Sequence, residues 1–411
     1  MKGSGFRTLG AAGHLLAGAL LALVAGCADE ERPPFLRISE ADQIAVNKGL
    51  REKLSKLPLN LKWDTYALAG ELVRNVFLDK ELLLIETGSN SVWAMDRTKG
   101  VILWKYNLQF PLRFRPAVGP DLVYLVARDV IHAVIRSGGD VKWKKQLPFV
   151  QGSAPVANDT FFYVAAGDVP RFYAFKEEVQ VPKLEKGEYQ GSLEAVPEWF
   201  INTDDYVRAD PVEITRGATS IVYVASYDHR VYALSGATGK VTWSYETGKE
   251  VICSPYVRGD RIYVGGLDHT LHCMNRYGGP PVQWLFPTGG PVERTPSGDD
   301  DFVYVRAENV LDEYGLPEDS YLYAVEVKTG QERWKFRRGL RMLISGKNKV
   351  YILREGNVLV ILEKETGKFL AEFPMPDFQF LLTNDSDDVL YAATDRGFLY
   401  AIQESNPVPF R

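Results

Sequence analysis

The sequence predicts an all-β protein, an eight-bladed β-propeller that is closed by its own N-terminal strand. Three observations lead to this fold class. A unit made of a hairpin and a third strand recurs over residues 60–411, most copies carry a tryptophan in the third strand, and residues 60–68 form a tryptophan strand with no hairpin before it. Residues 1–26 and 27–59 are expected to precede the propeller as a signal peptide and as a tether with a short helix.

The clearest copy of the repeat is residues 221–248, IVYVASYDHRVYALSGATGKVTWSYETG. Alternating β-branched residues predict a strand at 221–226, a hairpin partner at 231–234 and a third strand at 241–245. Gly239 lies in the second turn, where a residue free to adopt positive φ is needed. A short stretch before each hairpin is expected to supply the innermost, fourth strand.

A small residue occupies the middle of the second hairpin strand in almost every copy. It recurs about every 40 residues, which is the repeat length of a propeller blade with three or four strands. Two longer spacings predict insertions, one at 177–198 between a hairpin and its tryptophan strand and one at 308–320 inside a hairpin. The position is held in turn by Ala94, Ala133, Ala174, Ala233, Cys273, Ala324, Ile361 and Ala401.

The tryptophan strands indicate how the ring closes. The seventh unit has Ala371 in place of its tryptophan, and no tryptophan strand follows the last hairpin. We therefore expect the N-terminal strand to become the outer strand of the last blade, which leaves no open sheet edge. Each indole buries about 150–250 Å², or about 4–6 kcal/mol, and is expected to pack against a small side chain of the neighbouring blade. The expected blade-packing residues are Trp63, Trp104, Trp143, Trp199, Trp243, Trp284 and Trp334.

The N-terminus resembles a bacterial lipoprotein signal. Lys2 and Arg7 precede an apolar stretch at 15–25, which is short for a membrane span. The sequence VAGC, ending at Cys27, resembles a lipobox, which implies cleavage before Cys27 and a diacylglycerol thioether on its sulfur. An ordinary signal peptide with a chance cysteine is the alternative. Several acyl chains on one residue give stable anchoring, and Ala28 after the cysteine resembles an outer-membrane address.

Residues 38–57 are expected to form a helix before the propeller. Ser39 with Asp42 three residues later is a capping pattern, and Pro58 ends the helix. Apolar residues fall near one face of this helix, so we expect it to lean on the propeller or to space the propeller from the membrane. Binding of a partner by the helix is the alternative.

Charge and cysteine content exclude several classes of function. The net charge of −5, from 48 basic and 53 acidic residues, lacks the basic excess that is typical of nucleic-acid-binding domains. Cys253 is expected just before one strand and Cys273 two strands away in the same blade, roughly 9–10 Å apart, so free thiols are predicted. No spacing typical of a metal or haem site occurs. His229 and His269 recur in the same turn of neighbouring units and are interpreted as turn residues, with metal binding as the alternative.

The insertion at 308–320 is acidic and holds no basic residue. Two interpretations stay open, a solvated loop and a site for calcium or for a basic partner. Hairpin loops and the connections between blades should share one face of the ring, so the insertion is expected on the same face as 149–151 and 204–210. Basic residues that follow in the same unit and can neutralise it are Arg333, Lys335, Arg337, Arg338 and Arg341.

The units resemble the pyrroloquinoline-quinone-type (PQQ-like) propeller repeat, and within that superfamily the chain resembles the BamB family of outer-membrane assembly lipoproteins. The resemblance is carried by the lipobox, by the predicted eight closed blades, and by the segments FVQGSAP at 149–155 and DDYVRADP at 204–211. In the family the corresponding connections dock the periplasmic domains of a membrane-bound, BamA-like barrel-assembly protein. The implied partner-binding residues are Phe149, Gln151, Asp204, Asp205, Arg208 and Asp210.

We therefore expect a non-enzymatic scaffold, lipid-anchored at the periplasmic face of the bacterial outer membrane, that acts as a monomer within a larger complex and supports β-barrel insertion through protein–protein contacts. No cofactor and no metal are expected. A quinone-dependent dehydrogenase of this repeat type would need calcium ligands, an aspartate base and often adjacent cysteines, and the chain has no adjacent cysteines. The alternatives are a propeller that binds a quinone or another small ligand in its axial channel, and a lineage-specific propeller lipoprotein with an unrelated partner.

Overall fold

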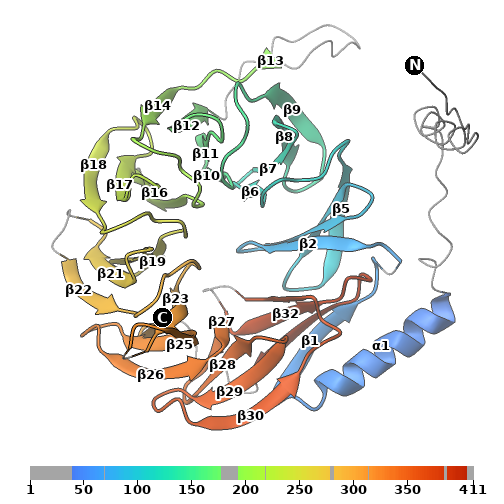
Figure 1. The fold of residues 1–411 in the computed structure, drawn as a ribbon. Coiled ribbons are helices and arrows are strands. Elements are labelled where there is room, and N and C mark those ends of the chain that lie inside the picture. Colours follow the sequence, from blue (N-terminus) through green and yellow to red (C-terminus); the bar gives the residue numbers. More distant parts are fainter. Residues whose placement is uncertain are drawn as a thin grey trace, which may run out of the picture. The chain divides into compact units, whose positions relative to one another are not determined.

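In the described part of the chain, eight β-sheets surround a central axis in the computed structural model, and one helix lies beside them (Figure 1). The structure describes residues 39–68, 70–176, 193–217, 219–277, 282–312, 314–383 and 387–404. The predicted signal peptide, Cys27 and the tether up to residue 38 lie outside the described residues. The ring of eight sheets confirms the predicted propeller. No helix among the described residues combines the length and the apolar character that a membrane crossing requires.

The first four blades follow one another along the chain. Blade 1 consists of β2 (Val73–Leu78), β3 (Leu82–Thr87), β4 (Ser91–Asp96) and β5 (Val101–Asn107). Blade 2 consists of β6 (Ala117–Val118), β7 (Leu122–Ala127), β8 (Val130–Ile135) and β9 (Val141–Gln146). Blade 3 consists of β10 (Val156–Ala157), β11 (Phe161–Ala165), β12 (Arg171–Lys176) and β14 (Trp199–Asn202). Blade 4 consists of β15 (Val212–Arg216), β16 (Thr219–Ala225), β17 (Arg230–Ser235) and β18 (Val241–Glu246).

The other four blades complete the ring. Blade 5 consists of β19 (Tyr256–Arg258), β20 (Arg261–Gly265), β21 (Thr270–Asn275) and β22 (Val282–Pro287). Blade 6 consists of β23 (Ser297–Gly298), β24 (Phe302–Leu311), β25 (Pro317–Glu326) and β26 (Glu332–Arg337). Blade 7 consists of β27 (Gly339–Ser345), β28 (Lys349–Arg354), β29 (Val358–Glu363) and β30 (Phe369–Pro374). Blade 8 consists of β31 (Phe380–Leu382), β32 (Val389–Ala393), β33 (Leu399–Glu404) and β1 (Leu59–Thr65).

The two ends of the propeller meet in blade 8. Strand β1 pairs antiparallel with β33, with Leu59 opposite Glu404 and Thr65 opposite Leu399. The first propeller strand thus becomes the outer strand of the last blade, as the tryptophan strand at 60–68 predicted. This pairing joins segments more than 300 residues apart and removes the strand edge that an open ring would expose.

The small hairpin residue lies between two aromatic side chains of its own blade. In blade 2, Tyr124, Ala133 and Trp143 lie directly opposite one another on three successive strands. Alanine ends at Cβ, so the two rings reach each other over it, with centroids 6.0 Å apart. The same tyrosine–tryptophan contact recurs at 5.8–6.1 Å in blades 3, 4, 5, 6 and 8.

In most blades the indole packs against a turn of the next blade. A Cβ added to Gly139 would lie 2.6 Å from the Trp104 Cβ, so only glycine fits beneath this indole. We expected the small hairpin residue of the neighbouring blade in this role, and the structure places a turn glycine there instead. Indole N–H groups also donate to backbone carbonyls of the next blade at 2.7–3.3 Å, from Trp63, Trp104, Trp199, Trp243, Trp284 and Trp334.

The helix compensates for the missing tryptophan of blade 7. Helix α1 (Glu40–Leu54) begins at Ser39, whose side chain accepts a hydrogen bond from the Asp42 N–H at 3.2 Å. Its buried Leu50 and Leu54 join the core cluster in which Ala371 also packs. Blade 8 draws its outer strand from the other end of the chain, so no turn joins its third and fourth strands. A tryptophan at 371 would therefore have no turn glycine to cover, and the helix leucines pack in this region.

The first insertion reaches back to the preceding blade. Its described end forms β13 (Leu193–Glu194), which pairs parallel with β9 of blade 2, while residues 177–192 lie outside the described residues. The insertion replaces the turn on which Trp143 would rest, and the Trp143 indole N–H has no hydrogen-bond partner in the described part of the chain. Cys253 and Cys273 are both buried and free, as predicted.

Candidate protein-binding face

One end of the propeller carries both the blade-to-blade connections and the hairpin turns that join the second and third strands. We call this end the connection face. A four-stranded meander places these loops together, because the chain reaches the same end after its second and fourth strands. Direct bonds confirm the grouping: the Asp204 N–H donates to Asp228 at 3.1 Å, and the Gln151 N–H donates to Asp129 at 3.0 Å.

The connection that contains Phe149 and Gln151 is anchored from within. Phe149 is 7% exposed and stacks on Tyr173 at 4.3 Å, and Gln151 is 1% exposed and donates from Nε2 to the Ser153 carbonyl at 3.0 Å. These two side chains therefore shape the connection and offer no contact area to a partner in this structure. Val150, which lies between them, is the exposed apolar residue that sequence reasoning missed.

The connection that contains Asp204 and Asp205 has a fixed backbone and outward carboxylates. The Asp205 carbonyl accepts hydrogen bonds from Thr203 Oγ1 at 2.7 Å and from Ser226 Oγ at 3.0 Å. Asp204 forms an ion pair with Arg230 at 3.1 Å while its side chain stays largely exposed. The two carboxylates therefore stand in defined positions on the connection face, where a partner can reach them.

Asp210 joins the two predicted segments to each other, and Arg208 bonds a residue outside both. Asp210 accepts a hydrogen bond from the Ala154 N–H at 3.0 Å and forms an ion pair with Arg115 at 3.3 Å. Arg208 donates from Nη2 to the Gly167 carbonyl at 3.0 Å. The segments 149–155 and 204–211, which the sequence singles out separately, are thus bonded to each other through Ala154 and Asp210.

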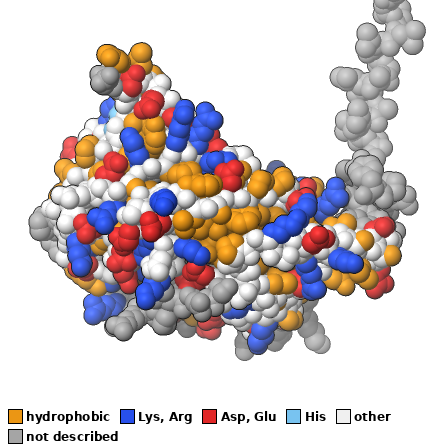
Figure 2. All heavy atoms as spheres, turned by 90° about the horizontal axis from the view of Figure 1, so that it is seen from below, with side chains coloured by type: hydrophobic (Ala, Val, Ile, Leu, Met, Phe, Trp, Pro, Cys, Tyr) orange, Lys and Arg blue, Asp and Glu red, His pale blue; other side chains and the backbone are white. Residues whose placement is uncertain are grey.

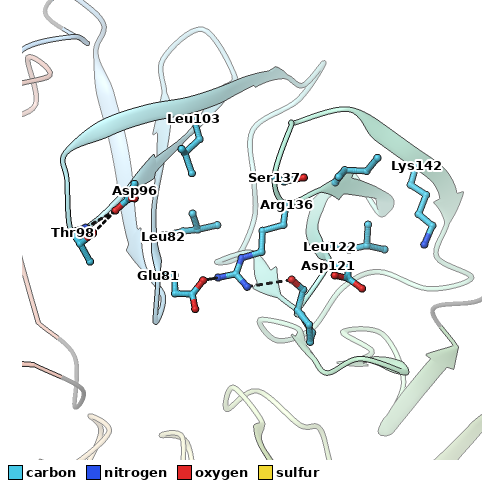
Figure 3. Close-up of a pocket in the computed structure, with 12 residues that line it drawn as sticks. Glu81, Leu82, Asp96, Thr98, Leu103, Asp121, Leu122, Arg136, Ser137 and Lys142 are labelled. Carbon is cyan, nitrogen blue, oxygen red and sulfur yellow. Dashed lines mark hydrogen bonds and ion pairs between the residues drawn. The ribbon is translucent and has the colours of Figure 1, made fainter.

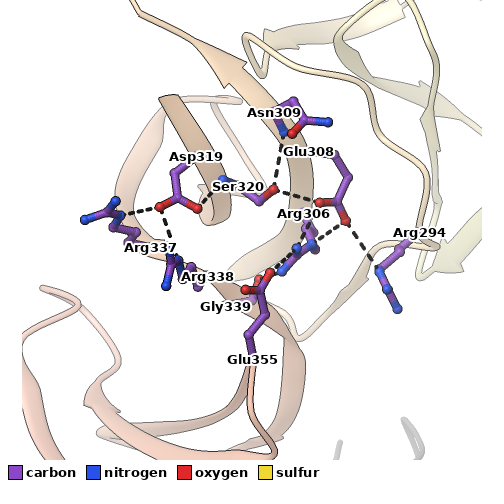
Figure 4. Close-up of polar contacts among 10 residues, drawn as sticks. All are labelled: Arg294, Arg306, Glu308, Asn309, Asp319, Ser320, Arg337, Arg338, Gly339 and Glu355. Atoms are coloured by element: carbon purple, nitrogen blue, oxygen red, sulfur yellow. Dashed lines mark hydrogen bonds and ion pairs between the residues drawn. The ribbon is translucent and has the colours of Figure 1, made fainter. Parts of the chain in front are cut away.

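The described residues of the acidic insertion at 308–320 extend the β24–β25 hairpin (Figure 4). Arg306 donates from Nη2 to Glu308 at 2.8 Å, and these bonds hold the pKa of the Glu308 carboxyl below its usual range. Asp319 pairs with Arg337 at 2.5 Å and with Arg338 at 3.3 Å. Arg337 and Arg338 were predicted to neutralise the insertion, whereas the role of Arg306 was missed because it precedes the acidic stretch.

The histidines of blades 4 and 5 occupy turn and strand positions. His229 and His269 adopt φ of 69° and 62°, so both occupy the left-handed turn position that the sequence suggested. His272 bonds Asp268 through Nε2 and Tyr245 through Nδ1, each at 2.9 Å. Among the described residues no group of three or more His, Cys, Asp or Glu side chains is placed to hold a metal ion.

A groove of about 790 Å³ opens between blades 1 and 2 on the face opposite the connection face (Figure 3). Leu82 and Leu122 contribute apolar lining. Arg136 crosses the rim, where it pairs with Glu81 at 2.5 Å and donates to the Pro120 carbonyl at 3.2 Å. A second, more polar hollow of about 450 Å³ is lined by the inner strands β6, β10 and β15 and the turns beside them. The larger groove lies off the axis of the ring. The small-ligand alternative expected a ligand in the axial channel, so this groove is a different position.

Comparisons with known proteins agree with this architecture. The chain aligns with the crystal structure of BamB from Moraxella catarrhalis at a TM-score of 0.63 and 14% identity, covering 86% of this chain and 99% of that chain. It aligns with the computationally designed Ika8 protein at a TM-score of 0.54 and 12% identity, covering 81% and 96%. It aligns with quinohemoprotein alcohol dehydrogenase from Comamonas testosteroni at a TM-score of 0.58 and 12% identity, covering 86% and 78%. These likenesses establish a shared fold.

The sequence itself carries the family signal. A comparison with curated proteins finds no match. The family model described as outer membrane protein assembly factor BamB matches residues 88–179, 207–276 and 255–406, which together span more than half of the chain. With its PQQ-like propeller, the chain belongs to the family of outer membrane protein assembly factor BamB.

Proposed function

We propose that this protein is a lipid-anchored, non-enzymatic scaffold that supports the assembly of β-barrel proteins in the bacterial outer membrane through protein–protein contacts. The family match over most of the propeller is the observation that carries this proposal. In this proposal residues 1–26 are a signal peptide, residues 27–59 are a tether and helix lipidated at Cys27, and residues 60–411 are the binding domain.

The partner we propose is the set of periplasmic domains of a BamA-like barrel-assembly protein. Exposed carboxylates at Asp204 and Asp205 can steer a basic surface toward the connection face, because complementary charges accelerate encounter and fix orientation. The lipid anchor confines the scaffold and the membrane-bound partner to one surface, which raises their effective concentration. The rigid ring holds the contacting loops in place, so binding orders few side chains.

A co-purification experiment in cells tests this function. Deleting the gene should deplete outer-membrane β-barrels, and the full-length protein should recover the barrel-assembly protein. The double substitution Asp204→Lys and Asp205→Lys should reduce that recovery, whereas Asp300→Lys, an exposed carboxylate on the opposite face, should not. Recovery of an unrelated protein, without the barrel-assembly protein, would support the lineage-specific alternative instead.

A small-ligand propeller is the second candidate, and the groove between blades 1 and 2 favours it. Its apolar lining and charged rim are features common in small-molecule sites. Titration with pyrroloquinoline quinone and calcium decides between the candidates. The scaffold proposal expects neither an absorbance change nor a shift in melting temperature, and a saturable change in either would favour the ligand-binding function.

A further inference from the structure

The hairpin of blade 6 extends beyond the other hairpins of the ring. Its strands β24 and β25 have ten residues each, whereas the paired second and third strands of the other blades have five to seven. The extension starts near Glu308 and turns back at residues 312–316. In Figure 2 it forms the projection at the upper left, whose end shows hydrophobic side chains.

Ion pairs fix the base of this hairpin (Figure 4). Arg306 is only 5% exposed and binds Glu308 through two nitrogens and Glu355 at 2.7 Å. Glu308 also accepts a hydrogen bond from Ser320 Oγ at 2.7 Å, which ties the outgoing strand to the returning one. Charge-assisted, bidentate bonds in a shielded position are among the stronger polar contacts in proteins. The hairpin is therefore held in one direction.

Backbone bonds attach the same base to the neighbouring connection. The Glu308 N–H donates to the Pro291 carbonyl at 2.9 Å, and the Leu311 N–H donates to the Gly289 carbonyl at 3.2 Å. Val310 between them is buried. The extension is thus supported by blade 5's exit loop as well as by its own ion pairs, and it stands on the connection face.

The tip presents apolar side chains on a preformed turn. Asp312 Oδ1 accepts hydrogen bonds from the Tyr314 N–H at 2.9 Å and from the Leu316 N–H at 2.8 Å, so the turn satisfies these backbone donors itself. Leu311, Tyr314 and Leu316 are 43%, 79% and 62% exposed. Exposed apolar clusters of this kind mark interaction sites, and tyrosine is enriched among the residues that dominate binding energy.

The charges at the tip indicate the chemistry of the partner. Asp312 and Glu318 are acidic, residues 311–320 hold no lysine or arginine, and neither carboxylate forms an ion pair within the described part of the chain. An acidic tip is repelled by an anionic lipid surface, and it is attracted to a surface that carries Lys and Arg. A protein pocket with an apolar floor and a basic rim fits both properties.

We propose that the tip of the β24–β25 hairpin docks into an apolar, basic-rimmed pocket on the periplasmic domains of the barrel-assembly protein. This inference rests on the proposed function, and it adds a second contact to the one at Asp204 and Asp205. Because the turn and its base are already ordered, docking costs little conformational entropy. Two separated contacts on one face also fix the orientation of the partner.

Site-specific photocrosslinking of the full-length protein in cells tests the docking site. A photoreactive residue is placed at Leu316, at Asp205, or at Leu285, which is similarly exposed on the outer strand β22 and serves as the control. Position 316 should crosslink to the barrel-assembly protein, at a peptide that contains apolar residues flanked by Lys or Arg. Position 285 should not crosslink to that protein.

The possible outcomes separate this inference from the proposed function. Crosslinking from 205 without crosslinking from 316 would overturn the docking site and leave the scaffold function standing. A lipid adduct at 316 would also overturn it, and no capture of the barrel-assembly protein from either position would overturn both proposals. As an independent measure, Tyr314→Ser with Leu316→Ser should lower the affinity for purified periplasmic domains at least tenfold, whereas Leu285→Ser should leave it unchanged. Equal affinity for the tip variant and the wild type would refute the docking site.

Discussion

The contact between an indole and the turn glycine of the next blade can be tested at Gly139, which lies under Trp104. Gly139 has φ of +80°, and a Cβ built on it would lie 2.6 Å from the Trp104 Cβ. Alanine there must adopt a left-handed conformation, which costs about 1–2 kcal/mol. It must also displace a packed indole, and overpacking of this kind costs about 1–3 kcal/mol. Gly139→Ala should therefore lower the free energy of unfolding by about 2–5 kcal/mol.

Gly259 supplies the matched control. Its φ is +58°, and a Cβ built on it meets nothing within 4 Å. Gly259→Ala therefore carries the conformational cost alone, about 1–2 kcal/mol. Equilibrium urea unfolding followed by circular dichroism measures both variants, with the slope compared to the wild type. Similar losses in the two variants would refute a tight fit of the indole on the turn.

A double-mutant cycle attributes the difference to the indole itself. Trp104→Gly removes the ring together with the Trp104 Cβ, the atom nearest the added methyl group, and leaves Gly139 uncovered. Because the added methyl group then has no indole to displace, the double variant should lose at least about 1 kcal/mol less than the sum of the two single losses. Strict additivity would show that the cost of Gly139→Ala comes from another source.

Three further predictions concern buried charge. Burial and neighbouring carboxylates raise the pKa of Asp388 to about 6, so the folded state retains a proton that the unfolded state loses, and stability falls as pH rises from about 4 to 6. Asp388→Asn should abolish this fall and add up to about 3 kcal/mol at pH 7.5, and an unchanged pH profile in urea titrations would contradict it. Burial lowers the pKa of His132 to about 4, so stability is lost as pH falls from about 6.5 to 4, and His132→Phe should flatten that acid limb in the same titrations. Arg306→Met should lower the free energy of unfolding by about 3–5 kcal/mol, because it leaves the shielded Glu308 carboxylate without its partner. Arg333→Met removes an exposed ion pair and should lower it by less than about 1 kcal/mol. Equal losses would argue against a special role for the buried arginine.

Much of the architecture was predictable because its signals are local. Alternation within strands, a small residue between two large ones and a glycine or histidine with positive φ in a turn each act within one hairpin. The substitution at blade 7 follows the same logic: Ile361 stands opposite Ala371, so a larger side chain occupies the middle strand where the tryptophan is missing. The tryptophan strand at 60–68 has no hairpin before it, and the last hairpin has no tryptophan strand after it, so matching strands to hairpins predicted the ring closure.

The candidate face was predictable only in outline. The positions of its two connections followed from the strand order, but the exposure of their side chains did not. Phe149 and Gln151 look like surface residues in the sequence, and the structure buries both: Phe149 stacks on Tyr173 of the neighbouring blade, and the Gln151 side chain bonds the Ser153 carbonyl. Exposure in a connection depends on contacts with other loops, and such contacts leave no periodic signal in the sequence.

The sequence by itself therefore determined the number of blades, the strand that closes the ring, the position of the insertions and the lipobox-like motif. Only the tertiary structure decided which connection residues face outward, which turn receives each indole, and that the acidic insertion is a braced hairpin with an apolar tip. The physical reason is the range of the interactions. Strand and turn preferences act over a few residues, whereas burial and the pairing of Arg306 with Glu355 depend on segments brought together from different blades.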